Sequence, residues 1–493
     1  MDFDDAVLRQ QLEVTQTWLA KFHVSSEGIC TLAGKYRGRD DCSFRSWHCG
    51  SFNLCVRLHW EDGRSDWLIR FPIPGKSMFP EEKLRNEVAI MQFVQQSTNI
   101  PVPTVIAYGT GADNPTGLGP FIIMTFVEGR KMSEIMKAKT TADDGEDILD
   151  PSMEDSTLKT LYGQLADILL ELFQHDFDRI GSLSFNSENS SWSVEERPVT
   201  LNMNETVRCS GLLDECFPSR VYSSAADYLL HLAQVHFLHL LKQRNSVFDA
   251  ADCREKYTCR HLFQAIVPHF ICREDNSGPY RLHCDDFSPS NILVDDHLHV
   301  VAVIDWEFCY AAPVQFSTSP PWWLLLRKPT DWLAAEGPQS FLDHYGPKLQ
   351  LFLQVMEQRE EARADLRTEH PLRRLSAHMR NSMDDNSFWF NMATRTSFGV
   401  DDVYWYMLDE HCYGQRKSIR ERVTKATSGV SIYSDREEFV VRKINQLLEY
   451  NADVGSHDTV SYEEHEEYSN LNDDIESAKV HNPLLRIFWC GFY

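Results

Sequence analysis

The sequence carries few positive charges for its length. Lysine and arginine total 48 against 73 aspartates and glutamates, which leaves a net charge of -25 over 493 residues. A chain this acidic repels both a phosphate backbone and an anionic lipid surface. We therefore expect no nucleic acid partner and no membrane partner, although a small basic patch is compatible with this total.

Long apolar runs are also missing. No segment approaches the run of about 18 apolar residues that a membrane span needs. The N-terminal stretch "MDFDDAVLRQQLEVTQTWLAKF" lacks the basic start and the apolar core of a secretory signal. The 13 cysteines include no Cys-x-x-Cys pair, which argues against a zinc site and a secreted disulfide framework. We expect a reducing compartment, the cytoplasm, with the nucleus as the alternative.

The first 130 residues alternate between strand and helix patterns. Apolar residues at helical spacing predict a helix over residues 4–22. The runs "NLCVRLHW" and "DWLIRF" flank "EDGR", and an Asp-Gly between apolar runs is a strong hairpin signal. A helix is predicted from Pro80, because proline suits the first helical position. The apolar runs "VPTVIAYG" and "PFIIMTFVEG" predict two further strands, so this part is an antiparallel sheet with one inserted helix.

The remainder of the chain is mainly helical in pattern. The segments "NILV" and "VVAVI", separated by "DDHLH", predict a small buried hairpin within it. The acidic "TADDGEDILD" is typical of a surface insertion. The aromatic-rich "FWFNMATRTSFGVDDVYWYMLDEHCYG" indicates core. Residues 453–476 hold nine acids and no lysine or arginine, so we expect a solvated, partly disordered tail.

These patterns divide the chain into five parts. We expect an N-terminal helix (1–25), a sheet-containing lobe (26–130), a helical lobe with the buried hairpin (131–345), a helical C-terminal extension (346–452) and an acidic tail (453–493).

Three oxygen-bearing side chains mark the stretch "DDFSPSNILVDDHLHVVAVIDWEF". Asp286 and Asn291 lie on an irregular Ser-Pro-Ser segment, and Asp305 lies across the predicted hairpin at a strand end. Phosphoryl transfer needs such a set, in which one carboxylate accepts or orients the substrate hydroxyl. An asparagine and an aspartate then hold Mg²⁺ on the phosphates. The alternative is a surface loop with ordinary turn residues.

The stretch "DDFSPSNILV…VAVIDWEF" resembles the catalytic loop and metal-binding strand of the aminoglycoside phosphotransferase family, which has the protein-kinase-like fold. The resemblance continues through "GSFNLCVRL", "DWLIRFPIPGK", "FPEEKLRNEVAIM" and "IPVPTVIAYG", and it points to the fungal phosphotransferase-like branch. It implies an α+β fold of two lobes. The small lobe would hold an antiparallel sheet with one helix and bind the nucleotide, and the larger helical lobe would hold the catalytic hairpin and a helical C-terminal extension.

The resemblance also implies a role for individual residues. Asp286 would be the catalytic base, and Asn291 and Asp305 would be the Mg²⁺ ligands. Arg70 lies where the family has its phosphate-binding lysine, and Glu87 lies where that lysine has its acidic partner. The remaining nucleotide contacts would come from the turn over the phosphates (Gly50, Ser51 and Asn53) and from the interlobe hinge beside adenine (Thr125, Phe126 and Val127).

Glu87 also stands out without the resemblance. It lies three residues after Leu84 and four before Met91, so it shares the buried face of the predicted helix. A buried carboxylate needs a cation. We therefore expect Glu87 to pair with a basic side chain.

The sequence departs from the family at three points. Cys284 lies where the family has a bracing histidine, Arg70 replaces a lysine, and Gly50 is the single glycine of the phosphate turn. The neighbouring His283 is expected in the core or directly behind the site residues, and Asp285 is expected to be a turn or hydrogen-bonding residue.

Three functions remain open. The first is an ATP-dependent kinase that phosphorylates a hydroxyl of a small molecule, with ATP and Mg²⁺ as cofactors. The second, a protein kinase, is disfavoured because "WEFCYAAPVQF" follows Asp305 in place of Phe-Gly, and no Ala-Pro-Glu follows. The third is a catalytically weak nucleotide-binding or scaffold protein. We favour the first, and the acids and aromatics of residues 315–410 are candidates for its acceptor site.

Overall fold

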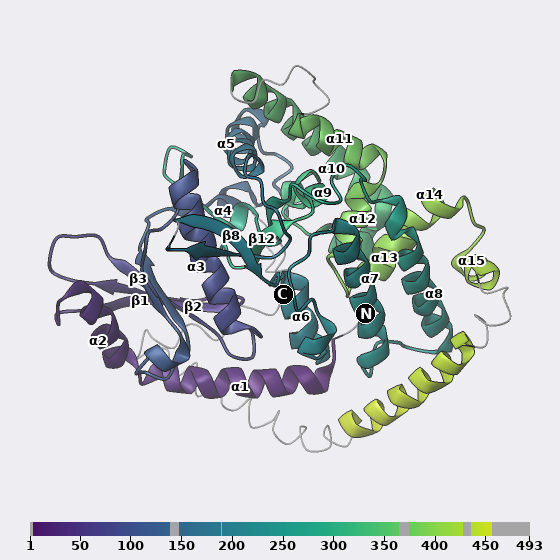
Figure 1. The fold of residues 1–493 in the computed structure, drawn as a ribbon, viewed down its shortest axis with the longest axis horizontal. Helices are drawn as coiled ribbons and strands as arrows, with labels where there is room; N and C mark the ends of the chain where they lie inside the picture. The colour runs from purple at the N-terminus through teal and green to yellow at the C-terminus, as the bar shows by residue number, and fades with distance from the viewer. Residues whose placement is uncertain (1–2, 139–146, 189, 364–373, 427–434, 456–493) are drawn as a thin grey trace.

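The structure is a computed structural model, and it describes residues 3–138, 147–188, 190–363, 374–426 and 435–455. Most of the predicted surface insertion and nearly all of the predicted acidic tail lie outside these residues. The described chain forms a smaller lobe around a sheet and a larger, mainly helical lobe (Figure 1). The predicted two-lobed α+β fold is confirmed.

The sheet of the smaller lobe is antiparallel, and its strands lie in the order β1-β2-β3-β5-β4. The strands are β1 (Ser43–Cys49), β2 (Asn53–His59), β3 (Trp67–Pro72), β4 (Val105–Gly109) and β5 (Phe121–Thr125). β2 and β3 form the predicted hairpin, with Leu54 opposite Phe71. Gly63 in the connecting turn has a φ of 72°, which glycine adopts without steric cost.

Three helices cover the two faces of this sheet: α1 (Asp5–His23), α2 (Ser26–Arg37) and α3 (Pro80–Ser97). In β5, Phe121 and Ile123 belong to the hydrophobic core that α1 and α2 share. Ile122 and Met124 belong to the core that includes the buried face of α3. Because successive side chains of a strand point to opposite faces, α1 and α2 cover one face and α3 covers the other (Figure 1). Burial on both faces explains why β5 is a continuous apolar run.

α3 begins where the sequence predicts. Pro80 occupies its first turn, and Glu81 and Glu82 lie beside the positive end of the helix dipole. Its buried face carries two opposite charges, Lys83 and Glu87, in addition to apolar residues. Since they are four residues apart, both charges point from the same side of the helix.

α2 was not predicted, because the sequence analysis expected strands directly after residue 22. Ile29, Leu32 and Ala33 are buried and lie at helical spacing. The helix ends at Gly38, whose φ of 72° is typical of a helix C-terminus. The predicted boundary after residue 25 thus falls between two helices.

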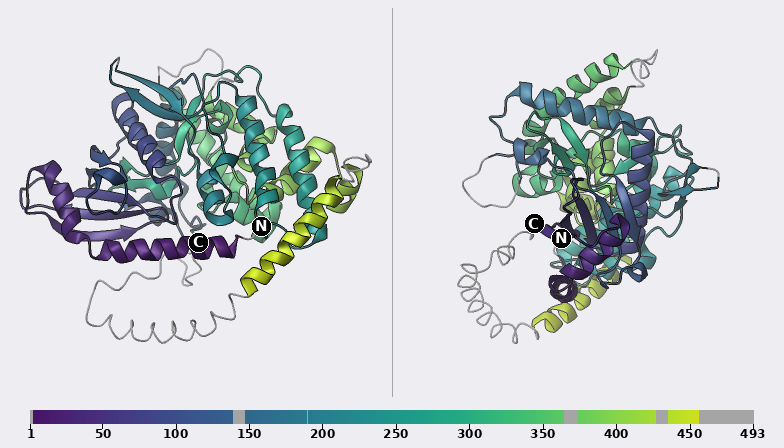
Figure 2. Two further views of the ribbon diagram at one scale, coloured as in Figure 1. Left: turned by 60° about the horizontal axis from the view of Figure 1, so that its bottom comes forward. Right: turned by 90° about the vertical axis from the view of Figure 1, so that its left-hand side faces the viewer.

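The larger lobe combines helices with short strands. Its strands are β6 (Arg130–Lys131), β7 (Ser182–Asn186), β8 (Ser191–Glu196), β9 (Arg281–Cys284), β10 (Ile292–Val294), β11 (Val300–Val303) and β12 (Cys309–Ala312). They pair as β11-β10-β6, β12-β9 and β7-β8, and the last pair is a hairpin that projects from the lobe (Figure 2). The first helices of the lobe are α4 (Met132–Met136), α5 (Asp155–Phe173), α6 (Leu201–Ser210), α7 (Ala225–Lys242), α8 (Ala250–Ile266) and α9 (Val314–Ser317).

The C-terminal helices complete this lobe: α10 (Pro329–Ala362), α11 (Leu375–Asp384), α12 (Ser387–Thr394), α13 (Val400–Val403), a π-helix (Tyr404–Leu408), α14 (Asp409–Tyr413), α15 (Ile419–Ala426) and a helix over residues 435–455. The predicted boundary after residue 345 falls within α10. Phe388, Trp389, Phe390 and Tyr404 are at most 2% exposed, so the aromatic-rich segment forms core, as predicted. None of the helices in the described ranges is long and apolar enough to cross a bilayer.

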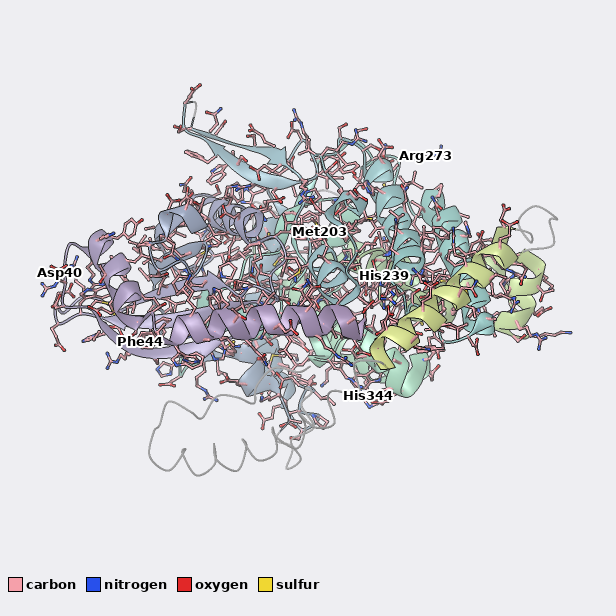
Figure 3. The ribbon with its side chains drawn as sticks, turned by 90° about the horizontal axis from the view of Figure 1, so that it is seen from below. Asp40, Phe44, Met203, His239, Arg273 and His344 are labelled. Atoms are coloured by element: carbon pink, nitrogen blue, oxygen red, sulfur yellow. The ribbon has the colours of Figure 1, made fainter. Side chains whose placement is uncertain are left out.

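α1 connects the two lobes along the underside of the molecule. Trp18, near its C-terminal end, is buried in the core of the smaller lobe and donates from its indole nitrogen to the carbonyl of Leu118 (2.9 Å). At the other end, the amide of Asp4 donates to the carbonyl of Cys209 in α6 (2.8 Å). Figure 3 shows α1 lying across this underside, with Phe44 of β1 near one end and the 435–455 helix beyond the other. The helix therefore contacts both lobes.

The middle of α1 packs closely on the loop after β3, and this packing predicts the effect of a substitution at Gly75 in that loop. Gly75 has a φ of 85°, and a Cβ there would lie 2.2 Å from the carbonyl oxygen of Gln11 and 2.4 Å from Thr15 Oγ1. Gly63 has a φ of 72° and no atom within 4 Å of such a Cβ. We expect Gly63→Ala to lower the free energy of unfolding by about 1 kcal/mol through backbone strain alone. Gly75→Ala should lower it by about 2–4 kcal/mol because α1 must also move. Urea denaturation measures both values, and equal losses would contradict the close packing of α1 on this loop.

Candidate active site

The hairpin of β10 and β11, called the catalytic hairpin below, positions the three oxygen-bearing side chains that the sequence analysis singled out. β10 and β11 pair antiparallel, with Ile292 opposite Val303. At the start of β10, the side-chain amide of Asn291 donates to the backbone carbonyl of Asp286 (2.9 Å) and to its Oδ2 (3.3 Å). The amide of Ile304 donates to the carbonyl of Asn291 (2.9 Å), and Asp305 follows directly. The hairpin thus brings Asp286, Asn291 and Asp305 to one end of its strands.

Asp305 has a backbone conformation that is uncommon for a residue other than glycine. Its φ is 58°, in the left-handed region. Aspartate tolerates this region better than most residues, but the conformation still costs free energy. The turn aims the carboxylate at the smaller lobe, where it meets Arg70.

Arg70 joins the two lobes through its guanidinium group. Its Nη2 forms an ion pair with Glu87 of α3, and its Nη1 lies 2.5 Å from Asp305 Oδ1. The side chains of Arg70 and Glu87 are only 5% and 2% exposed, whereas that of Asp305 is 32% exposed. The structure therefore places Glu87 beside a cation, as its helical position predicts.

These contacts change the pKa values of the groups involved. Burial opposes the positive charge of Arg70, but Glu87, Asp305 and Glu307 outweigh it and raise the pKa of the guanidinium. For Glu87, burial outweighs the attraction of Arg70, so the pKa of this carboxyl is raised. Burial also raises the pKa of Asp305. The negative charge of Glu307 raises it further, whereas Arg70 acts in the opposite direction.

A second buried ion pair was missed by the sequence analysis. Lys83 Nζ pairs with Glu307, which lies two residues after Asp305, and both side chains are at most 3% exposed. Asn53 bridges them, because its amide donates to Glu307 Oε2 (2.8 Å) and its Oδ1 accepts from Lys83 (3.0 Å). The spacing of Lys83 and Glu87 was the available signal, because a lysine four residues before a buried acid faces the same side of the helix.

The predicted phosphate turn lies between β1 and β2. The amide of Gly50 donates to the carbonyl of Asn53 (2.8 Å), which closes the turn, and Ser51 at its tip is exposed. Phe52 packs edge-on against Phe308 of the larger lobe, with 5.3 Å between ring centroids. The turn is thus attached to the segment that carries Asp305 and Glu307, and Asn53 is engaged by Glu307. A contact of these residues with nucleotide stays a prediction.

The predicted hinge follows β5. The amides of Thr125 and Phe126 donate to the carbonyls of Thr104 and Asp66, each at 3.0 Å. Val127 is the predicted hinge residue whose amide has no hydrogen-bond partner within the described part of the chain. A contact of this amide with a nucleotide base stays a prediction.

The surroundings of Asp286 raise the pKa of its carboxyl to near neutral pH. Burial raises the pKa of its carboxyl, the negative charges of Glu307 and Asp305 raise it further, and the value reaches about 7. A general base works best when its pKa is near the working pH. The shift places Asp286 in that range.

The donor set fits a magnesium ion bound together with phosphates. Among the described residues there is no cluster of three histidines, cysteines or acids arranged to hold a metal. Magnesium sites that also use phosphate oxygens need only one or two protein ligands. Asn291 donates through its amide nitrogen to Asp286, which leaves its Oδ1 for a cation, and Asp305 adds a carboxylate.

The surroundings of Cys284 disfavour a role as a nucleophile. It lies opposite Cys309 in the β9-β12 pair. A hydrogen bond with the Cys309 thiol, together with burial, raises the pKa of Cys284 well above its ordinary value. A raised pKa disfavours the thiolate, the form in which a cysteine reacts.

The Arg70–Glu87 pair predicts a large stability effect. We expect Glu87→Gln to lower the free energy of unfolding by about 3–5 kcal/mol, because Arg70 then remains as a buried and less compensated charge. As a control, Glu196→Gln breaks the exposed contact with Arg85 (3.6 Å) and should cost less than about 1 kcal/mol. A double-mutant cycle with Arg70→Gln, followed by urea denaturation, tests the pair. Strictly additive losses would show that the two side chains do not interact.

Comparisons with known proteins give the family. The model of the phosphotransferase enzyme family matches residues 50–316, more than half of the chain. Clavilactone A biosynthesis cluster protein Y of Ampulloclitocybe clavipes is 25% identical over 284 residues, which cover 55% of this chain and 62% of that protein. Altered inheritance of mitochondria protein 9, mitochondrial, of Zygosaccharomyces rouxii is 34% identical over 142 residues, 29% of this chain and 22% of that protein. The match thus spans less than two thirds of either relative.

Solved structures show a weaker likeness. Aminoglycoside phosphotransferase APH(4)-Ia is 11% identical with a TM-score of 0.38, over 76% of this chain and 98% of that chain. An ethanolamine kinase of Plasmodium vivax is 12% identical with a TM-score of 0.33, over 80% and 84% of the two chains. These low scores leave the family assignment to the sequence model. Because that model covers more than half of the chain, and both relatives named above are fungal proteins, the chain belongs to the phosphotransferase enzyme family and resembles its fungal members.

Proposed function

We propose that the protein is an ATP-dependent kinase that transfers the γ-phosphate of ATP to a hydroxyl group of a small molecule. The observation that carries the proposal is the meeting of Asp286, Asn291 and Asp305 at one end of the catalytic hairpin, with Arg70 reaching Asp305 from the other lobe. This arrangement unites a base, two oxygen ligands and a cation at the junction of the lobes.

In the proposed reaction, the acceptor hydroxyl attacks the γ-phosphorus. A bond forms between the acceptor oxygen and phosphorus, and the bond between phosphorus and the oxygen of the leaving ADP breaks. The proton of the hydroxyl moves to the carboxylate of Asp286. The positive charge of Arg70 stabilises phosphate oxygens, and Asn291 keeps the Asp286 carboxylate oriented by donating to it.

Magnesium fits this proposal as the second cofactor. Asn291 and Asp305 would hold the ion, which would neutralise charge on the phosphates when bound. Arg70 occupies Asp305 Oδ1 in this structure, so the guanidinium shares that carboxylate with the ion or releases it.

A nucleotide-binding protein with weak catalysis is the second candidate. The contact between Arg70 and Asp305 favours it, because the guanidinium occupies an oxygen that magnesium would use. The two functions differ in one measurable property, since only the kinase releases ADP from ATP when an acceptor is present.

The test is a screen of the purified protein with Mg-ATP over a library of metabolites that carry hydroxyl groups, with release of ADP as the readout. We expect Asp286→Asn to lower turnover by about two orders of magnitude or more, because a positioned general base is lost. ATP affinity, measured by calorimetry, should stay within about threefold, because Asp286 acts on the acceptor hydroxyl. Unchanged turnover in the variant would exclude Asp286 as the base, and nucleotide binding without ADP release from any acceptor would favour the second candidate.

The raised pKa of Asp286 predicts how stability depends on pH. In the folded protein the carboxyl keeps its proton up to about pH 7, whereas in the unfolded chain it loses it near the ordinary value of 3.8. The folded state therefore loses stability as pH rises between these values, and the full cost is present above pH 7. We expect Asp286→Asn to remove this cost, on the order of a few kcal/mol at about 1.4 kcal/mol per pKa unit.

Thermal unfolding of the wild type and Asp286→Asn at pH 5 and pH 8 measures this difference. The variant should gain more in melting temperature over the wild type at pH 8 than at pH 5. Equal gains at the two pH values, or a larger gain at pH 5, would mean that the folded-state pKa of Asp286 is not raised.

A further inference from the structure

Asp285, the residue before the proposed base, belongs to a buried charged cluster. Its Oδ1 lies 3.3 Å from Arg395 Nη1, and its Oδ2 accepts a hydrogen bond from the amide of Leu201 (3.2 Å). The side chains of Asp285 and Arg395 are 6% and 17% exposed. Leu201 is the first residue of α6, so the positive end of the helix dipole faces the carboxylate.

His283 completes this cluster as a neutral acceptor. Arg395 Nη1 lies 2.5 Å from His283 Nε2, and arginine can only donate. The imidazole proton therefore sits on Nδ1. Burial and the charge of Arg395 lower the pKa of His283, which keeps the ring neutral. The pKa of Asp285 is lowered despite its burial, because the charge of Arg395 and the hydrogen bond from the Leu201 amide favour the carboxylate.

Arg395 reaches the catalytic loop from α12, beyond the residues that the family model matches. Asn391, one helical turn earlier, fixes α12 to the segment that follows β12. Its Oδ1 accepts from Gln315 Nε2 (2.6 Å), and its amide donates to the carbonyl of Gln315 (2.8 Å) and to Ser319 Oγ (2.8 Å). The guanidinium of Arg395 also lies over the ring of Phe316, 5.0 Å from the ring centroid. Arg395 is thus held in a fixed direction before it meets Asp285.

Packing alone does not hold Asp285. Its side chain borders a small cavity that is also lined by Thr200, Tyr228 and Tyr310. The hydroxyl groups of both tyrosines are buried and make no hydrogen bond to the described residues. The carboxylate is therefore oriented by its charged and hydrogen-bonding partners, Arg395 and the Leu201 amide.

We propose that Arg395 and Asp285 form a brace that positions the catalytic loop, so that the C-terminal helices take part in phosphoryl transfer through Asp286. The backbone supports this role. The amide of Asp285, the residue directly before the base, donates to the carbonyl of Phe308 (3.1 Å). Arg395 is a positioning residue that acts through Asp285. The inference rests on the proposed kinase function, and it explains how the loop stays ordered where Cys284 replaces the family's histidine.

The test compares Arg395→Gln, Asp285→Asn and the double variant with Arg416→Gln as a matched control. Arg416 lies in the same C-terminal region, is 13% exposed, and pairs with the buried Asp409 instead of the loop. Two measurements are made: the kcat and KM for ATP, with water or an identified hydroxyl compound as acceptor, and hydrogen exchange of the amides of residues 284–291.

We expect each single brace variant to lower kcat about tenfold or more while the KM for ATP changes less than about threefold, because a misplaced base affects the chemical step. Exchange over residues 284–291 should be faster. The double variant should lose no more than the worse single variant, because a neutral pair leaves no lone charge. Arg416→Gln should lower the melting temperature and leave both kcat and loop exchange unchanged.

Wild-type kcat and wild-type loop exchange in folded Asp285→Asn and Arg395→Gln would overturn the brace, as would the same losses in Arg416→Gln. If the wild type itself turns over no ATP with any acceptor, the proposed function fails, and loop exchange then decides the brace by itself.

Discussion

The junction of the two lobes depends on buried charges that have to stay paired. Arg70 and Glu87 form one pair and Lys83 and Glu307 the other, and each of these side chains is at most 5% exposed. Charges without water around them are costly unless an opposite charge compensates them. α3 supplies one charge of each sign, so it cannot shift along its axis without separating both pairs. The position of α3 and the direction of Asp305 are therefore set together.

The same crowding of charge prepares the candidate base. Glu307 and Asp305 raise the pKa of Asp286, whereas Lys83 and Arg70 lower that of Glu307. The cations keep Glu307 ionised, and its negative charge then acts on Asp286. A group at the lobe junction thus adds to the effect of burial on the pKa of Asp286, although no hydrogen bond connects the two carboxyls in the described structure. The crowding that raises the pKa of Asp286 also costs folding free energy, a common property of active sites.

The sequence predicted those features that arise from local patterns. The Asp-Gly turn indicated the β2-β3 hairpin, Pro80 indicated the start of α3, and the helical spacing of Glu87 indicated a buried acid. The catalytic hairpin followed from two short apolar runs. The roles of these residues with nucleotide and metal remain predictions.

Features that depend on distant contacts could not be predicted in this way. Lys83 and Glu307 are 224 positions apart, and Arg395 and Asp285 are 110 apart, so no local pattern connects the two members of either pair. α2 was missed for a different reason, because its short sequence contains two glycines, which lower helix propensity, and the helix is stabilised by packing against the sheet. Asp285 was predicted to be a turn or hydrogen-bonding residue, and it does accept hydrogen bonds, but its partners could not be named from the sequence because they lie in α6 and beside α12.

α1 has a mechanical consequence for the movement of the lobes. A helix is stiff along its length, and this one is attached to the smaller lobe through Trp18 and to the larger lobe through Asp4. Opening of the two lobes away from each other would bend the helix or detach one of its ends. Rotation about the long axis of α1 would strain it least, because it neither lengthens nor bends the rod. The fold therefore favours a twisting motion between the lobes over a jaw-like opening (Figures 1 and 3).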